Sequence, residues 1–285
     1  MKKTVLIILC VIMLGLVFPS SAQADFGPKP SVVIDFHGLD GEIYYATLLA
    51  REKSTGPWSN TGEYLRYKEG DKDFEIFKKF AAYKDADDFY FLQFFEECSE
   101  TNRFEWGYFP PQEFKVLLYF PKTDSFITSG ESYTRYAFDS YFTAKITGQS
   151  LNLTEISLAK SYDYTNEILS LLIRILLTIA IELLIALLFG FRWKRVLKVI
   201  IIVNVVTQIT LNVMLNLVNY HMGSMAFVGC YILLEIAVCA IEAAVYVKYL
   251  QNTGSKRRLI CYALVANAAS FALGLLLAIH IPGIF

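Results

Sequence analysis

Four apolar runs in the second half of the chain limit what this protein can fold into. The runs cover residues 168–191, 199–219, 225–247 and 259–281. An α-helix rises 1.5 Å per residue, so each run is long enough to cross a hydrocarbon core of about 30 Å. We therefore predict an all-α transmembrane domain over residues 166–285, built as a bundle of four helices that cross the bilayer.

Basic residues gather in two of the loops between these runs. The loop at residues 192–198 contains four Lys or Arg side chains, and the loop at residues 248–258 contains four more. The loop at residues 220–224 and the C-terminal end contain none. Because loops rich in Lys and Arg stay in the cytoplasm, we predict that both basic loops are cytoplasmic and that the C-terminus is extracellular.

The first 24 residues have the pattern of a cleaved signal peptide. Two lysines precede an apolar core that ends at Phe18, and small residues follow up to Ala24. This order is typical of a secretory signal with an A-x-A cleavage site, and the apolar core is short for a membrane span. Cleavage and export would place residues 25–165 outside the cytoplasm, in agreement with the orientation that the basic loops predict.

Residues 25–165 are polar and aromatic, and short segments with strand character recur between turn signals. These segments are 31–38, 42–50, 88–97, 103–109, 113–121 and 136–146. Residues 73–84 instead have helical spacing, with Phe74, Phe77 and Phe80 on one face. We predict a mainly-β, sandwich-like domain with one inserted helix. An α+β sheet with the helix on one face is the alternative.

The composition of this exported domain argues against several functions. It carries 23 acidic and 15 basic side chains, a net charge of −8, which disfavours nucleic acid as a partner. Cys98 is its only cysteine, so we expect no internal disulfide. No HExxH, GxSxG or paired-cysteine spacing is present, and we interpret the acidic run at 85–88 as a solvated loop rather than a calcium site. We favour a non-enzymatic protein with no catalytic residue, metal or cofactor.

Polar side chains recur inside all four apolar runs. Asn204, Gln208, Asn212 and Asn216 follow one another every four residues, so they share one side of a helix. Polar residues within spans usually face the bundle interior or a water-filled cavity. The predicted intramembrane polar network consists of Arg174, Glu182, Asn204, Thr207, Gln208, Asn212, Glu235, Glu242 and Asn267.

Predicted depths in the bilayer sort most of this network into two layers, when counted at 1.5 Å per residue from the outer boundary. The inner layer contains Glu182, Asn204, Glu242 and Asn267. The outer layer contains Arg174, Gln208, Asn212 and Glu235. Three glutamates face one arginine in the network, so two carboxylates have no obvious cationic partner within the spans.

Two interpretations of the polar network stay open. In the first, its members are hydrogen-bonding glue between helices, each contributing about 0.6–2 kcal/mol, and Arg174 pairs with Glu235. In the second, a carboxylate that lacks a cation binds a proton or a metal ion in turn. The first interpretation predicts sealed carboxylates, and the second predicts that Glu182 or Glu242 lines a wet cavity. Intramembrane enzyme chemistry is a third class, for which the spans contain no recognised motif.

The order of these features resembles a group of uncharacterised envelope proteins of Gram-positive bacteria. The resemblance is carried by the signal peptide, KPSVVIDFHGLDGEIYYATLLAREKSTGPWS, PPQEFKVLLYFP, AFDSYF, and a span with Glu182 followed by NVVTQITLN. It implies a bacterial cell and no mechanism. Four spans with a buried glutamate are also similar in architecture to small multidrug exporters, which have no counterpart of the exported domain.

We therefore expect a multi-pass protein of the bacterial cell membrane. Its exported domain would make it an envelope sensor, a scaffold or an accessory subunit. The alternative is a small oligomeric cation- or proton-coupled transporter that uses the buried glutamates. The expected partner is the lipid bilayer. Other envelope proteins or a homo-oligomer stay open as partners, and nucleic acid does not.

Overall fold

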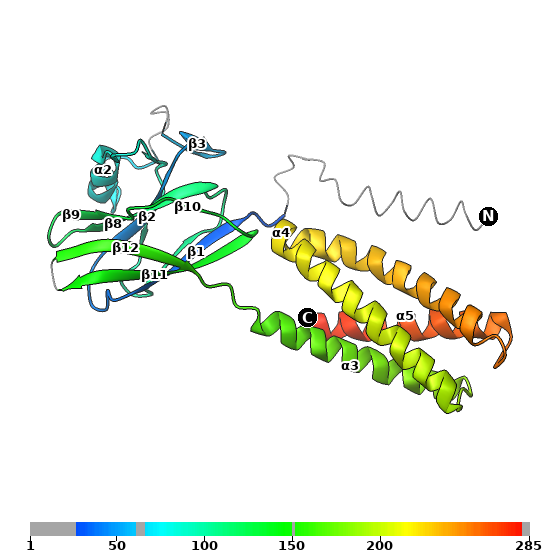
Figure 1. The fold of residues 1–285 in the computed structure, drawn as a ribbon. Coiled ribbons are helices and arrows are strands. Elements are labelled where there is room, and N and C mark those ends of the chain that lie inside the picture. The colour runs from blue at the N-terminus through cyan, green and yellow to red at the C-terminus, as the bar shows by residue number, and fades with distance from the viewer. Residues whose placement is uncertain (1–26, 61–65, 150–151, 281–285) are drawn as a thin grey trace. The chain divides into compact units, whose positions relative to one another are not determined.

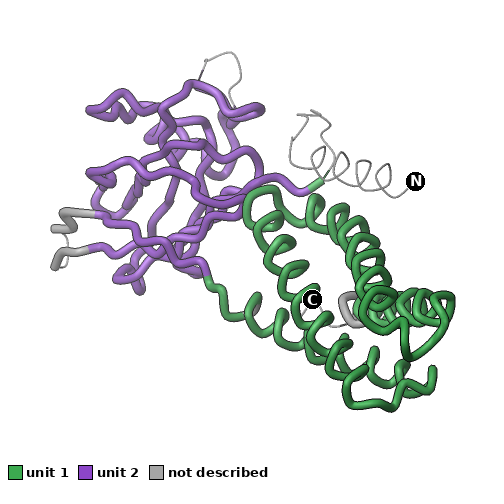
Figure 2. The backbone as a smooth tube through the Cα atoms, turned by 45° about the vertical axis from the view of Figure 1, so that its right-hand side comes forward, with its two compact units in different colours: residues 1–27, 163–285 green, residues 28–162 purple. Residues whose placement is uncertain are grey.

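The structure, a computed structural model, describes residues 27–60, 66–149 and 152–280. The predicted signal peptide lies outside the described residues. The described chain divides into two compact units (Figure 2). Pro28–Tyr162 form a β-rich unit, and a helical unit begins at Asp163. The expectation of a β-rich region followed by long apolar helices is thus confirmed.

The first main sheet of the β-rich unit has four strands in the order β12-β11-β1-β7. They are β1 (Ser31–His37), β7 (Arg103–Trp106), β11 (Asp139–Gln149) and β12 (Asn152–Lys160). β1 pairs in parallel with β11 and antiparallel with β7. The first predicted strand therefore lies inside a sheet between partners that come much later in the chain.

The second main sheet has six strands, in the order β10-β8-β2-β5, with β6 beside β2 and β9 beside β8. They are β2 (Tyr45–Ala50), β5 (Tyr90–Phe91), β6 (Glu96–Glu97), β8 (Glu113–Phe120), β9 (Ser125–Thr128) and β10 (Tyr133–Thr134). A separate hairpin joins β3 (Ser54–Thr55) to β4 (Trp58–Ser59).

The two main sheets share one hydrophobic core. Ile34 of β1, Leu48 of β2 and Val116 of β8 are all completely buried in it. Successive side chains of a strand point to opposite faces, so their neighbours Leu49 and Leu117 point away from this core. The second sheet is therefore buried on both faces.

Helix α2 (Phe74–Ala82) covers the other face of the second sheet (Figure 1). Phe77 and Phe80 are its buried residues, and they pack in one cluster with Leu49, Leu117 and Tyr119 of the sheet. The helix predicted at residues 73–84 from the spacing of its phenylalanines is therefore confirmed, and its phenylalanine face is the one that packs on the sheet.

The prediction of one continuous strand over residues 88–97 is wrong. The segment contains two separate two-residue strands, β5 and β6, with Gln93 between them in the left-handed region at φ 63°. The Gln93 side chain donates to the Ser59 carbonyl at 2.9 Å and accepts from the Arg66 N–H at 3.0 Å. These long-range hydrogen bonds hold a backbone conformation that ends a strand.

Among its described residues, the helical unit contains three helices that are long and apolar enough to cross a membrane. They are α3 (Thr165–Leu188), α4 (Lys194–Tyr249) and α5 (Lys256–His280). The prediction of four separate helices is therefore wrong, because the runs at 199–219 and 225–247 both belong to α4.

Helix α4 folds back on itself at Gly223 (Figure 1). Gly223 has φ 80° and ψ 178°, a conformation open to glycine because it has no Cβ. We call residues 194–222 the first arm and residues 224–249 the second arm. Leu211 and Leu215 of the first arm form a buried cluster with Leu234 and Val238 of the second. One residue reverses the chain here, where the sequence predicts a loop.

The two basic loops lie at the same end of the helical unit. The backbone N–H groups of Gly190, at φ 76°, and Phe191 bond back to carbonyls in the last turn of α3, each at 2.9 Å. This pattern closes the C-terminus of a helix. The Arg258 guanidinium at the start of α5 donates to the Phe189 carbonyl, which joins the start of α5 to the end of α3 beside the first basic loop.

Candidate functional site

Two glutamates from different helices meet in the core of the helical unit. Glu182 lies on α3 and Glu242 on the second arm of α4, and both are 0% exposed. Their carboxyl groups lie close enough to interact electrostatically. We call these two residues the acidic pair.

One oxygen of Glu182 receives all the side-chain donors that reach this carboxyl group. Its Oε2 accepts from Asn204 Nδ2 at 2.6 Å, Tyr262 Oη at 3.4 Å and Tyr246 Oη at 3.5 Å. Its other oxygen, Oε1, is buried and has no hydrogen-bond partner among the described residues. This carboxyl group is thus well held on one side and open to one further donor on the other.

Both oxygens of Glu242 accept a short hydrogen bond. Thr207 Oγ1, on the first arm of α4, donates to Oε1 at 2.7 Å, and Asn267 Nδ2, on α5, donates to Oε2 at 2.7 Å. The acidic pair therefore connects α3, both arms of α4 and α5. Every long helix of the unit contributes a side chain to this cluster.

The charges and hydrogen-bond donors around the acidic pair limit what the cluster can bind. In the described part of the chain, no Lys or Arg side chain forms an ion pair with either glutamate. Two adjacent carboxylates cannot both ionise in an apolar interior without a large penalty. A proton on one carboxyl group would supply the donor that Glu182 Oε1 lacks. The geometry therefore fits a pair in which at least one carboxyl group is protonated.

The residues of the predicted outer layer line a polar cavity. Arg174, Gln208, Asn212 and Glu235 line a partly open cavity of about 20 Å³, which is room for one water molecule. Arg174 Nη1 donates to Asn212 Oδ1 at 3.5 Å, and Asn212 Nδ2 donates to the Gln208 carbonyl at 2.8 Å. Arg174 also attracts Glu235 electrostatically.

The structure thus brings the predicted network together as two adjoining groups, with Thr207 in the inner one. Asn216 of the four-residue ladder is not part of either group and lines a separate groove with Glu167 and Tyr220. Sequence reasoning missed Tyr246 and Tyr262, whose hydroxyls reach Glu182. The available signal was that a buried tyrosine hydroxyl usually finds a polar partner.

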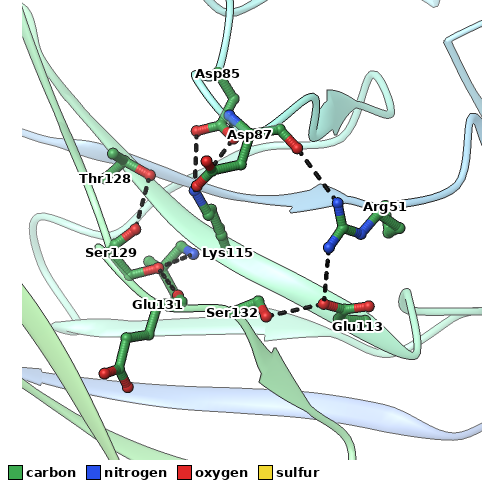
Figure 3. A network of polar contacts seen from close by, with 10 residues as sticks. Arg51, Asp85, Asp87, Glu113, Lys115, Thr128, Ser129, Glu131 and Ser132 are labelled. Carbon is green, nitrogen blue, oxygen red and sulfur yellow. Dashed lines mark hydrogen bonds and ion pairs between the residues drawn. The ribbon is translucent and has the colours of Figure 1, made fainter.

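The β-rich unit contains a polar cluster of its own (Figure 3). Lys115 of β8 is buried and forms ion pairs with Asp85, at 3.2 Å, and with Asp87. The hydrogen bond and the positive charge of Lys115 lower the pKa of Asp87. The interpretation of residues 85–88 as a solvated loop is wrong for Asp85, whose side chain is 1% exposed. The cluster fastens the segment after α2 to the sheet.

No family model, curated protein or solved structure matches the chain. A functional assignment therefore depends on the residues of the chain alone.

Proposed function

We propose that the protein is a non-enzymatic, multi-pass protein of the bacterial cell membrane. Its helical unit would anchor the β-rich unit, a two-sheet sandwich with one covering helix, on the outer side of the membrane. There the β-rich unit would act as an envelope sensor, a scaffold or an accessory subunit. The observation that carries this proposal is the sealing of the acidic pair.

The complete burial of the two carboxyl groups argues for a structural role of the polar network. Glu182 and Glu242 are 0% exposed, and each receives a donor from another helical segment at 2.6–2.7 Å. A transport site must be open to water on one side at a time. A carboxyl group that is enclosed and hydrogen-bonded instead joins helices to one another.

The arrangement of the loops supports the proposed orientation. Both basic loops lie at one end of the helical unit, and Arg258 contacts the Phe189 carbonyl there. The reversal at Gly223 separates the two arms of α4 without an intervening charged loop. Lys and Arg on one side of a bilayer and none in the turn fit a cytoplasmic location of both basic loops.

The test is the melting temperature of the detergent-purified full chain across pH 5 to 8. If the pair is neutral, Glu182→Gln and Glu242→Gln should each melt within about 2 °C of the parent at every pH. A glutamine amide, like a protonated carboxyl group, offers one donor group and one acceptor oxygen. Glu167→Gln, outside the cluster, is the matched control. Marked stabilisation by either core variant, with loss of the parent's pH dependence, would contradict the proposal.

Proton-coupled transport is the second candidate function. The observation that favours it is Glu182 Oε1, a buried oxygen open to a proton beside a second carboxyl group. This candidate predicts proton flux into liposomes that contain the purified protein, and loss of that flux in Glu182→Gln. Equal flux in the parent and the variant would exclude the acidic pair as the carrier.

A further inference from the structure

A lateral groove lies between the beginning of α3 and the end of the first arm of α4. Its volume is about 590 Å³, within the range of about 300–1,000 Å³ that is typical of sites for organic ligands. Its lining residues lie between positions 164 and 171 and between positions 213 and 221, and we call it the α3–α4 groove. Both segments lie at the end of the helical unit opposite the basic loops. The proposed orientation places that end on the outer side of the membrane.

The two walls of the α3–α4 groove have the same gradient of polarity. The residues nearest the helix ends are polar, and they are Tyr164, Glu167, Tyr220 and His221. Further along both helices the lining becomes apolar, and the apolar residues are Ile168, Leu171, Val213 and Leu217. Because α3 leads away from this end and the first arm leads towards it, the polar ends of the two walls face each other. A ligand that lies along the groove therefore meets polar groups at one end and hydrocarbon along the rest.

The polar end of the groove combines one acidic side chain with several neutral ones. Glu167 is acidic, and no Lys or Arg is among the described residues that line the groove. The neutral polar residues are Tyr164, Asn216, Tyr220 and His221. A tyrosine hydroxyl, an amide and a neutral imidazole can each both donate and accept a hydrogen bond. Tyr164 and Glu167 also act electrostatically on Tyr220, so polar groups of the two walls lie close together.

We propose that the α3–α4 groove binds one membrane lipid with an uncharged, hydroxyl-bearing headgroup, as in a glycosyl diacylglycerol. An acyl chain of the lipid would lie against Ile168, Val213 and Leu217. A phosphate headgroup only accepts hydrogen bonds and is repelled by Glu167, and an ammonium headgroup only donates and leaves the donors of the neutral residues unused. The hydroxyls of a sugar both donate and accept. The inference goes beyond the proposed function, because it assigns a lipid to the helical unit, and it rests only on the proposal that this unit lies in a bilayer.

The experiment measures lipid binding to the full chain by native mass spectrometry in a polyoxyethylene detergent, which contains no sugar. The probes are a monoglucosyl diacylglycerol, a phosphatidylglycerol and a phosphatidylethanolamine with identical acyl chains. We expect the glucolipid to bind about tenfold or more tightly than either phospholipid. Equal affinity for all three lipids would overturn the proposal, because the headgroup would then not be recognised. Tightest binding of the phosphatidylethanolamine would also overturn it, because the ammonium group would then be the selected feature.

Two leucine variants locate the bound lipid. Leu217→Trp adds bulk inside the groove, and Leu172→Trp adds the same bulk on α3 at a position outside the groove lining. Both leucines are about half exposed, so both variants should fold. Leu217→Trp should weaken glucolipid binding about tenfold or more, and Leu172→Trp should leave it unchanged. Full binding in a folded Leu217→Trp protein would place the lipid elsewhere and overturn the proposal.

Glu167→Gln tests how the headgroup is selected. Without the carboxylate, phosphatidylglycerol should bind more tightly than it does to the parent, and the preference for the glucolipid should narrow. An unchanged preference in a folded Glu167→Gln protein would overturn the proposed role of Glu167 in excluding anionic headgroups. None of these outcomes depends on the Glu182→Gln and Glu242→Gln results, so the two proposals can fail separately.

Discussion

Lys115 is the side chain on which the polar cluster of the β-rich unit depends. It lies in the interior with Asp85, and the two carboxylates that it contacts have different exposures, 1% for Asp85 and 62% for Asp87. Removing one partner of a buried ion pair leaves the other charge without compensation. Lys115→Met should therefore destabilise the unit by about 3 kcal/mol, as measured by urea unfolding followed through tryptophan fluorescence.

The double variant Lys115→Met/Asp85→Leu distinguishes loss of packing from an uncompensated charge. Because both buried charges are then gone, we expect it to regain most of the stability that the single variant loses. A double variant that is as unstable as Lys115→Met would show that the packing of the lysine chain, and not its charge, holds the segment after α2.

The same cluster predicts how stability changes in acid. Lys115 lowers the pKa of Asp87 from its ordinary value of 3.8, so the folded state holds this carboxylate more strongly ionised than the unfolded state. The stabilisation is present above pH 3.8 and is lost as the pH falls through the lower folded value. Lys115→Met should flatten this part of the acid dependence of the unfolding free energy. An unchanged slope would argue against the pairing.

Cys98 should be inert towards thiol reagents. Burial raises its pKa to about 12, so little thiolate forms at neutral pH. Maleimide should modify Cys98 only after unfolding, whereas the exposed Cys261 should react in the folded, detergent-purified protein. Mass spectrometry of the two peptides measures both rates. Fast modification of Cys98 in the folded chain would contradict its enclosed position.

The polar face of α4 could be predicted from sequence because helical spacing is a local property. Asn204, Gln208 and Asn212 recur every four residues and are all buried. The tyrosine partners could not be predicted in the same way. Tyr246 and Tyr262 are ordinary aromatic residues of apolar runs until the second arm of α4 and α5 pack against α3 and their hydroxyls reach Glu182.

At the scale of elements, the reversal of α4 depends on one glycine. Gly223→Ala would place a Cβ on a backbone at φ 80°, ψ 178°, which costs about 1–3 kcal/mol. We expect a lower melting temperature and a larger aggregated fraction on size-exclusion chromatography. Gly229→Ala is the matched control, because a Cβ there meets nothing within 4 Å among the described atoms. It should be neutral or slightly stabilising, since alanine favours helix. A reversed order of the two variants would contradict this account.

Two predictions about elements, the continuous strand at residues 88–97 and the separate helices on either side of Gly223, are wrong for the same physical reason. Residues 88–97 have the composition of a strand, yet Gln93 interrupts it through contacts with residues 34 and 27 positions earlier. Gly223 ends one arm and begins the next without the loop that charge and polarity would have marked. In both places a single backbone conformation decides the structure, and neither periodicity nor propensity specifies that conformation.

For the whole molecule, the proposed orientation can be tested by labelling in intact cells that express the protein. Glu42→Cys and Ser224→Cys place thiols at exposed positions predicted to be outside, and Asn252→Cys places one in the second basic loop. A membrane-impermeant maleimide should label the first two above the level of the parent chain. It should label Asn252→Cys only after lysis. Labelling of Asn252→Cys in intact cells would overturn the orientation.

The pairing of the strands within the sheets could not be predicted from the sequence. β1 pairs in parallel with β11, so that Ser31 lies beside Asp139, 108 positions further along the chain. Alternation identifies a strand and its buried face, but it does not name the partner of that strand. The β-rich composition of the unit was therefore predictable, while the order of its strands was not.

The acidic pair has a consequence for how the protein would be assembled in a bilayer. Glu182, Glu242 and Asn267 each find their donors or acceptors on a different helical segment. Until those segments meet, each one carries a polar group that hydrocarbon solvates poorly. Partial bundles would therefore be unstable intermediates, and insertion would end in one cooperative closing step. A chain truncated before α5 would leave Glu242 without its Asn267 donor and would therefore be less stable in the bilayer.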